Sequence, residues 1–222
     1  MRAKWDAIDE RVVRDITQFQ KASGKPIRML DIGCGRGEIV SDLRPFLKEY
    51  VGTDASDRML PTSHVQGVRF IRAEAEKLPA SLKGFDLVLF KESLDHCYDG
   101  GKALQNACRA LRKGGRVIVT LNNRSSYYKV LFKAAARRAQ AGQSDHFEFY
   151  DMPSLMQALR VAGFEIVSAE SFNFLKLPVF LERVLGALPA WVLRWKLKSA
   201  DALGHLLMPR GGGSIKVTGI KI

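Results

Sequence analysis

The sequence has few cysteines, and their spacing does not suit a metal site. Cys34, Cys97 and Cys108 are odd in number, and no two of them form a C-x-x-C motif. A disulfide framework needs paired cysteines, and structural zinc sites need closely spaced ligands. We therefore expect reduced thiols in a cytosolic protein, and no bound metal.

Long apolar runs are also missing. No stretch reaches the roughly 18 consecutive apolar residues of a membrane span. The first residues, MRAKWDAIDERVV, contain no apolar run followed by a small-residue cleavage site. The sequence therefore predicts neither a membrane-spanning helix nor a secretory signal. We expect a cytoplasmic protein and leave association with a membrane surface open.

Acidic residues are scarce relative to basic ones. The 222 residues include 35 Lys and Arg against 23 Asp and Glu, so the formal net charge is +12 and the pI is about 9.8. This excess suits an anionic partner such as nucleic acid, anionic lipid or a phosphorylated substrate, and it is equally consistent with a solvated basic surface. The length and the 46% of hydrophobic residues suit a single folded domain over residues 1–222.

Apolar residues at helical spacing predict an amphipathic helix over residues 1–24. Strand-like and helix-like stretches then alternate over residues 27–121. Strands are predicted at IRMLDIG, YVGTDAS, VRFIRAEA, FDLVLFKES and RVIVTLNN, and helices at GEIVSDLRPFL and GKALQNACRALRKGG. This alternation predicts an α/β fold with a parallel sheet and right-handed crossovers, covered by helices on both faces. Two further strands, FEIVSAESF and SIKVTGIKI, follow.

Two segments interrupt the alternation after the fifth strand. Residues 124–150 are predicted to form an inserted helix or lid, and residues 172–212 an apolar and basic helical insertion between the sixth and seventh strands. Basic amphipathic segments with tryptophans are typical of helices that lie on anionic lipid. A lid packed on the domain and a dimer contact are the alternatives. Both segments leave the sheet at its carboxyl edge, where ligands bind, so we expect them to cover a substrate site.

A carboxylate stands two residues before three alternating glycines at the end of the first predicted strand. In MLDIGCGRGEIV, Asp31 precedes Gly33, Gly35 and Gly37. Glycines let a strand turn sharply into a helix and let a ligand approach the backbone N–H groups. An acid here would repel a pyrophosphate and attract a cation, and S-adenosylmethionine is the common nucleoside cofactor with a cationic amino-acid end. A second acid, Asp54, ends the next strand and is spaced to bind both ribose hydroxyls.

These residues make the chain resemble the class I S-adenosylmethionine-dependent methyltransferases of small-molecule type. LDIGCGRGEI resembles the first motif of that family, VGTDAS the second, RAEAEKLP the third, and FDLVLFKESLDHCYD the fourth strand with the loop over the methionine end of the cofactor. The resemblance spans roughly residues 27–164. It implies a Rossmann-like, mostly parallel seven-stranded sheet whose last strand is antiparallel. The chain departs from the family at residues 172–212, because the sixth and seventh strands usually lie close in sequence.

The resemblance also implies which residues bind the cofactor. Asp54 would bind the ribose with Ala55 beside the adenine, and Glu74 would face the adenine amino group. The predicted cofactor-binding residues are Asp31, Gly33, Cys34, Gly35, Gly37, Asp54, Ala55, Glu74, Ala75, Phe90, Lys91 and Glu92.

His96 and His146 are the candidate catalytic bases. His96 lies in the loop after the fourth strand, on the side where the methyl group should point, and His146 lies in SDHFEFYD, which borders the acceptor pocket in similar proteins. Histidine titrates near neutrality, and a general base assists transfer to a hydroxyl acceptor. The alternative for His96 is packing or hydrogen bonding within its loop. Neither histidine lies in a cluster of metal ligands.

Three functions are compatible with these features. The first is methyl transfer to a small, lipid-linked or sugar-linked acceptor, with oxygen as the expected methylated atom. The second is RNA methylation, which the net charge permits, although FKES replaces the Asn/Asp-Pro-Pro-aromatic tetrad of enzymes that methylate exocyclic amines, and a separate RNA-binding module is not evident. The third is cofactor binding without turnover. The acceptor molecule and the oligomeric state are not determined by the sequence.

Overall fold

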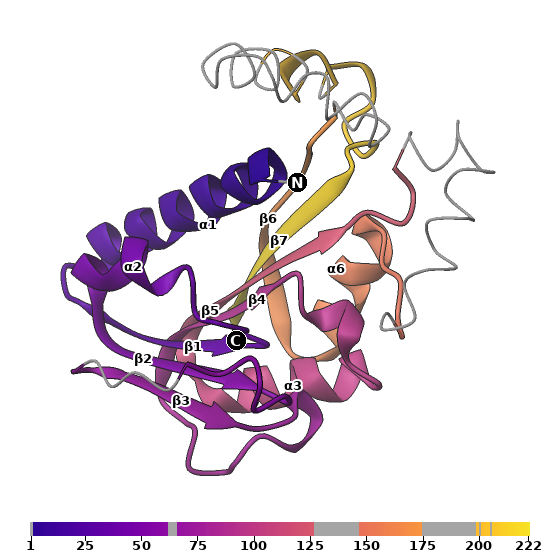
Figure 1. Ribbon diagram of the computed structural model, residues 1–222. Coiled ribbons are helices and arrows are strands. Elements are labelled where there is room, and N and C mark those ends of the chain that lie inside the picture. The colour runs from indigo at the N-terminus through magenta and orange to yellow at the C-terminus, as the bar shows by residue number, and fades with distance from the viewer. Residues whose placement is uncertain (1, 62–65, 127–146, 175–198, 200, 205) are drawn as a thin grey trace.

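A seven-stranded sheet forms the centre of the computed structural model (Figure 1). The structure describes residues 2–61, 66–126, 147–174, 199, 201–204 and 206–222. The strands are β1 (Ile27–Ile32), β2 (Leu47–Asp54), β3 (Val68–Arg72), β4 (Phe85–Lys91), β5 (Leu111–Asn122), β6 (Phe164–Phe172) and β7 (Ser214–Lys221). They lie in the order β3-β2-β1-β4-β5-β7-β6, and β7 runs antiparallel to both of its neighbours. The predicted mostly parallel sheet with an antiparallel last strand is confirmed.

Helices cover both faces of this sheet. The described α-helices are α1 (Arg2–Ser23), α2 (Val40–Leu43), α3 (Gly100–Ala110) and α6 (Met152–Val161), and the 3-10 helices are η1 (Arg44–Phe46), η2 (Ala75–Lys77) and η3 (Leu94–His96). One buried cluster joins α1 and α2 to one face, and a second joins α3 and α6 to the other. In Figure 1, α1 lies across one face while α3 and α6 lie behind the opposite one.

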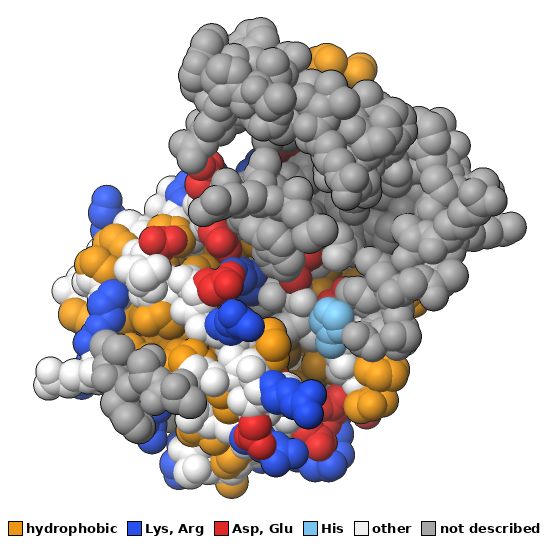
Figure 2. All heavy atoms as spheres, viewed as in Figure 1, with side chains coloured by type: hydrophobic (Ala, Val, Ile, Leu, Met, Phe, Trp, Pro, Cys, Tyr) orange, Lys and Arg blue, Asp and Glu red, His pale blue; other side chains and the backbone are white. Residues whose placement is uncertain are grey.

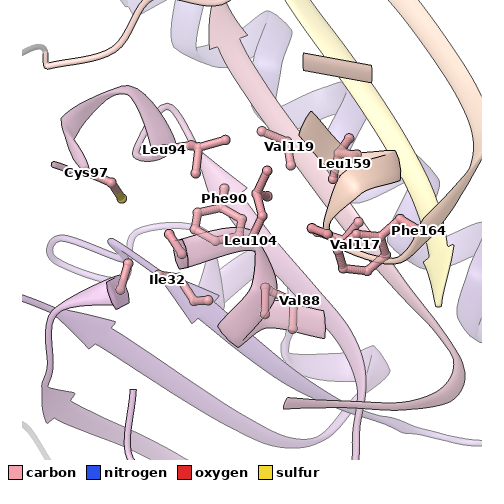
Figure 3. Close-up of a cluster of buried hydrophobic side chains, with 14 of the residues drawn as sticks. Ile32, Val88, Phe90, Leu94, Cys97, Leu104, Val117, Val119, Leu159 and Phe164 are labelled. Carbon is pink, nitrogen blue, oxygen red and sulfur yellow. The ribbon is translucent and has the colours of Figure 1, made fainter. Parts of the chain in front are cut away.

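Strand β4 shows how the sequence fits a central strand. Leu87 and Leu89 pack on the α1 side, whereas Val88 and Phe90 pack on the α3 and α6 side, and all four are fully buried. Figure 3 shows Val88 and Phe90 within the second cluster. Because alternate side chains point to opposite faces, a strand covered on both sides must be apolar throughout.

The helix predicted after the first strand is much shorter than expected. Helix α2 begins only at Val40 and ends at Leu43, where η1 follows. Gly35 and Gly37 have φ angles of +54° and +66°, which a right-handed helix does not allow. Pro45 lies within η1 and cannot donate a helical hydrogen bond. The glycines and the proline therefore limit the helix at its two ends.

Helix α3 also ends earlier than predicted. The glycine pair Gly114-Gly115 suggested the stop, but Leu111 already has extended backbone angles and begins β5. Leu111 pairs in register with Phe85 of β4 and is buried. Burial of this leucine in the sheet outweighs the helical periodicity of the residues before it.

The two predicted insertions fall largely outside the described residues, because residues 127–146 and 175–198 are among those not described. The described end of the second insertion contacts α1. Asp201 accepts a hydrogen bond from Arg11 at 2.7 Å and another from the Phe174 backbone N–H at 3.0 Å. Within the described residues, no helix is long and apolar enough to cross a membrane.

Candidate cofactor and active site

The glycine turn after β1 has a backbone shape that only glycine adopts easily. Gly33 has a φ angle of +73°, and a Cβ atom there would overlap the side chain of Ser93. The backbone N–H groups of Gly33 and Cys34 both donate to the Thr53 carbonyl, at 2.7 and 2.9 Å. At Gly35 an added Cβ would meet only the Met59 methyl group, at 3.5 Å. The turn is thus packed tightly at Gly33 and open at Gly35.

Asp54 lies beside this turn at the end of β2. One carboxylate oxygen accepts from the Gly35 N–H at 3.0 Å, and the other accepts from the Ser56 N–H at 2.9 Å. Each carboxylate oxygen has capacity for a further donor. Asp54 therefore fixes the open part of the turn and still presents acceptor sites there.

Asp31 is buried in the same region with one oxygen unsatisfied. Its side chain is 1% exposed, and its Oδ2 accepts from the Tyr50 hydroxyl at 2.7 Å. Its Oδ1 has no hydrogen-bond partner among the described residues. Burial raises the pKa of Asp31 from 3.8 to about 6, against the Tyr50 hydrogen bond and the positive charge of Lys91, which lower it. A buried carboxylate with a free acceptor oxygen suits a cationic donor.

Lys91 connects this acidic region to the N-terminal helix. It ends β4, and its Nζ lies 2.9 Å from Asp9 Oδ1 of α1. Both side chains are largely buried, at 15% and 29% exposure. One end of α1 is thereby held against the carboxyl edge of the sheet.

Polar and charged side chains lie side by side on neighbouring strands across the α1 face of the sheet. We call Lys91, Thr120, Lys216 and Glu170 the polar row. Lys91 pairs in register with Thr120, Thr120 with Lys216, and Lys216 with Glu170. Lys216 is 3% exposed and forms ion pairs with Glu170, at 2.7 Å, and with Asp15 of α1. Arg11 and Arg14 of α1 lie 3.8 and 3.6 Å from Glu170, so residues of α1 form ion pairs at three of the four positions of the polar row.

Other predicted cofactor residues lie at the adjoining strand ends. Ala55 follows Asp54 and is exposed. Glu74 follows β3, is half exposed and pairs with Lys77 at 2.7 Å, an ion pair that keeps the pKa of Glu74 below its ordinary value. Ala75 is buried, and its carbonyl accepts from Asn106.

Phe90 and Glu92 occupy different environments although they are close in sequence. The side chain of Phe90 is fully buried in the apolar cluster beneath α3 and α6, so it does not line the glycine turn (Figure 3). Glu92 is 9% exposed and has a positive φ of 54°, which is uncommon for a residue with a side chain. Its N–H donates to the Thr120 carbonyl at 2.9 Å. Of the two, Glu92 departs from regular strand geometry at the carboxyl edge.

His96 is exposed at the end of η3. The preceding residue, Asp95, accepts backbone hydrogen bonds from Phe147 and Glu148, at 2.9 and 3.3 Å. These contacts hold the described end of the first insertion against the loop that follows β4. The second candidate base, His146, lies outside the described residues.

Two residues that support this site were not predicted from the sequence. Tyr50 donates to Asp31, and Asp9 pairs with Lys91. Tyr50 is a hydroxyl-bearing aromatic residue within a predicted apolar strand, which was a usable signal. Asp9 gave none, because its partner is 82 residues away in the sequence.

The cysteines do not add a reactive or metal-binding group to this site. Burial raises the pKa of Cys97 to about 12 and also raises the pKa of Cys34, so both thiols stay protonated at neutral pH. In the part of the chain that the structure describes, no three His, Cys, Asp or Glu side chains are grouped to hold a metal ion. The contribution of Cys34 to the turn is its backbone N–H.

Comparison with known proteins gives related sequences and folds. A family model described as "Methyltransferase domain" matches residues 5–169. The ubiquinone biosynthesis O-methyltransferase of Roseobacter denitrificans is 32% identical over 161 residues, covering 68% of this chain and 64% of that protein. The chain thus matches less than two thirds of the length of this relative.

Solved structures share the fold at low sequence identity. The YcgJ protein of Bacillus subtilis superposes with a TM-score of 0.64 at 19% identity, over 94% of this chain and 98% of that one. A protein described as the [4+2]-cyclase SpnF superposes with a TM-score of 0.61, also at 19% identity, over 89% of this chain and 76% of that one. These likenesses concern the fold alone, which serves more than one kind of chemistry.

Proposed function

The chain belongs to the methyltransferase-domain family, and from that premise we propose that it transfers a methyl group from S-adenosylmethionine to an oxygen atom of a small, lipid-linked or sugar-linked acceptor. Family membership implies use of this cofactor. The observation that carries the proposal is the buried Asp31 carboxylate beside an open glycine turn, with one oxygen unsatisfied.

The residues at this turn fit the chemistry of the cofactor. Asp31 Oδ1 would accept a hydrogen bond from the cationic ammonium group of the methionine end, and Asp54 would accept from the two ribose hydroxyls. The open space at Gly35 would let the cofactor approach the backbone. A diphosphate would fit poorly, because its charge would face the buried Asp31.

Catalysis by this chain would depend mainly on positioning. The bound cofactor supplies a methyl group on a positively charged sulfur, which is already electrophilic. The chain has to hold the acceptor oxygen in line with that methyl group and keep water out, and such alignment can contribute on the order of 7–11 kcal/mol. His96 would take the proton of the acceptor hydroxyl.

Replacing His96 with glutamine should lower kcat about tenfold and leave the cofactor affinity unchanged. A general base contributes about 10²–10⁴-fold at a closed site, and we expect a loss smaller than this range because this histidine is exposed and water can replace it. Once an acceptor is known, steady-state kinetics with isothermal titration of S-adenosylhomocysteine would measure both effects. An unchanged kcat would exclude His96 as the base.

The nature of the acceptor is supported by the relatives and by charge. The relative from Roseobacter denitrificans is described as an O-methyltransferase of ubiquinone biosynthesis, which favours transfer to oxygen. RNA methylation is favoured by the net charge of +12. On the face shown in Figure 2, however, basic side chains lie among acidic ones rather than in one continuous patch. Cofactor binding without turnover is the third candidate, because the family match implies use of the cofactor and does not test turnover.

The decisive experiment is incubation of the full chain with cell extract and trideuteromethyl-labelled cofactor, followed by mass spectrometry. Methyl transfer predicts a product that carries the heavy methyl group, absent when the chain is omitted. Enzymatic digestion of RNA from the same reaction would place the label in nucleosides if the acceptor is RNA. Binding of S-adenosylhomocysteine with no labelled product in any fraction would favour the non-catalytic function, and no binding at high micromolar concentration would contradict the cofactor assignment.

A membrane surface is the proposed source of a lipid-linked acceptor. Leu206 and Leu207, near the end of the second insertion, are 79% and 66% exposed. Exposed leucines beside a basic segment are typical of interfacial contacts. Replacing both with aspartate should lower the partition coefficient for phosphatidylglycerol vesicles, measured by sedimentation, about hundredfold, since two buried side chains of this size contribute about 3 kcal/mol. Partition equal to that of the unsubstituted chain would contradict the contact.

A further inference from the structure

A pocket between α1 and strands β5, β6 and β7 lies away from the glycine turn. Its volume is about 340 Å³, and Phe19, Arg116, Ser168 and Thr218 are among the residues that line it. Arg116 precedes Thr120 of the polar row by four residues on β5, a distance of about 13 Å along a strand. The pocket therefore lies on the α1 face, begins beside Lys216 and Glu170 of the polar row, and extends along β5 toward Arg116.

The charged groups of this pocket leave one cation without an acidic partner. Three cations and two acids line it: Arg14, Lys216, Arg116, Asp15 and Glu170. Lys216 contacts both acids, and Arg14 lies 3.5 Å from Asp15 and 3.6 Å from Glu170. No acidic residue in the described ranges forms an ion pair with Arg116. Its guanidinium instead lies 4.7 Å from the centre of the Phe19 ring, and its buried Nε has no hydrogen-bond partner among these residues.

The floor of the pocket offers a second unsatisfied group. Thr218 of β7 is 4% exposed, and its hydroxyl has no hydrogen-bond partner among the described residues. It pairs in register with Ser168 of β6, which lines the same pocket. A buried hydroxyl without a partner costs about 1–3 kcal/mol, so it is expected to meet a ligand or water.

We propose that this pocket binds a small organic oxyanion, a carboxylate or a phosphate ester, through Arg116 and Thr218. The planar guanidinium donates two parallel hydrogen bonds to such a group, and the threonine hydroxyl donates a third. The volume is near the lower limit of ordinary ligand pockets, about 300–1,000 Å³, and so suits an anion with only a few carbon atoms. The site does not depend on methyl transfer, because none of its residues belongs to the cofactor site.

Thermal unfolding with added anion tests the proposal. The full chain is titrated with sodium phosphate and, separately, with sodium succinate, while sodium chloride holds the ionic strength constant. We expect a saturable rise in Tm with at least one of the two, and the one that acts identifies the preferred group. No rise with either anion up to 50 mM would overturn the proposal.

Two variants and a matched control locate the binding. Arg116→Met should weaken the apparent affinity about tenfold or more, and Thr218→Val about threefold. Arg69→Met removes the same charge from an exposed arginine on β3 and should bind like the unsubstituted chain. If Arg116→Met fails to fold, Thr218→Val still decides, because valine has the shape of threonine and no hydroxyl. Unchanged affinity in Thr218→Val, or an equal loss in Arg69→Met, would overturn the proposal.

Discussion

Replacing Asp31 with asparagine is expected to weaken S-adenosylhomocysteine binding about hundredfold at pH 7.5. The variant keeps an acceptor for the Tyr50 hydroxyl but loses the buried negative charge that would face the ligand ammonium group. Hydrogen bonds between charged groups contribute about 1.5–3 kcal/mol, which corresponds to roughly 10–100-fold in affinity. Isothermal titration of both proteins would measure the loss.

The pH dependence of the same binding is a second signature of Asp31. Its pKa is about 6, so its carboxylate is largely ionised at pH 7.5 and about one tenth ionised at pH 5. The affinity of the unsubstituted chain should therefore fall about tenfold between pH 7 and pH 5, while Asp31→Asn should show no such fall. Asp57→Asn, which removes an exposed acid from the loop after β2, is the control and should keep the full pH dependence.

The free energy of unfolding should change in the opposite direction to affinity. Well below pH 3.8 Asp31 is protonated in both the folded and the unfolded state, so its burial costs nothing electrostatically. Between pH 3.8 and about 6 the unfolded state loses this proton while the folded state keeps it, so the free energy of unfolding falls, by about 3 kcal/mol in all, and levels off above pH 6. Asp31→Asn should thus be more stable than the unsubstituted chain by up to about 3 kcal/mol above about pH 6.5, with little difference near about pH 3. Urea unfolding across this range would measure it. Equal free energies of unfolding for Asp31→Asn and the unsubstituted chain at pH 7.5 would mean that the buried charge of Asp31 does not destabilise the fold.

Replacing Gly33 with alanine should lower the free energy of unfolding by about 3–5 kcal/mol. The left-handed backbone costs a residue with a side chain about 1–2 kcal/mol. In addition, the new Cβ would overlap Ser93, whose hydroxyl donates to the Ile32 carbonyl at 2.6 Å and fixes its position. Denaturant unfolding of the full chain would measure the change.

Gly24 separates the two causes. It has a similar φ angle of +68°, but an added Cβ there would meet nothing within 4 Å. Gly24→Ala should therefore cost only the backbone part, about 1–2 kcal/mol. If the free energy of unfolding fell equally in both variants, the close approach of Gly33 to Ser93 would contribute nothing to the cost of Gly33→Ala.

The sheet could be predicted from the sequence because its strands are locally distinct. The central strands β1 and β4 are short apolar runs, and the glycine turn identifies where the first strand ends. Helix lengths were predicted less well. Leu111 continues the helical periodicity of the residues before it, and only its burial against Phe85 makes it the start of β5.

The site could be predicted from the sequence where residues that act together lie within one short stretch. Asp31 and the glycines lie within seven residues, so the acidic turn is visible in the sequence. The side chain of Phe90 illustrates the limit, because which face of β4 it occupies depends on the register of the whole strand. The pairing of Asp9 with Lys91 depends on how α1 crosses the sheet, and no local pattern records that.

Charged side chains of α1 form ion pairs with the polar row beneath it. Asp9 and Asp15 contribute two of the negative charges that face Lys91 and Lys216, while Ile8, Val12 and Ile16 of the same helix cover apolar side chains of β1 and β4. A chain shortened to begin at residue 25 would expose both the ammonium groups and the leucines to water. Such a truncation is therefore expected to give aggregated protein rather than a smaller working domain.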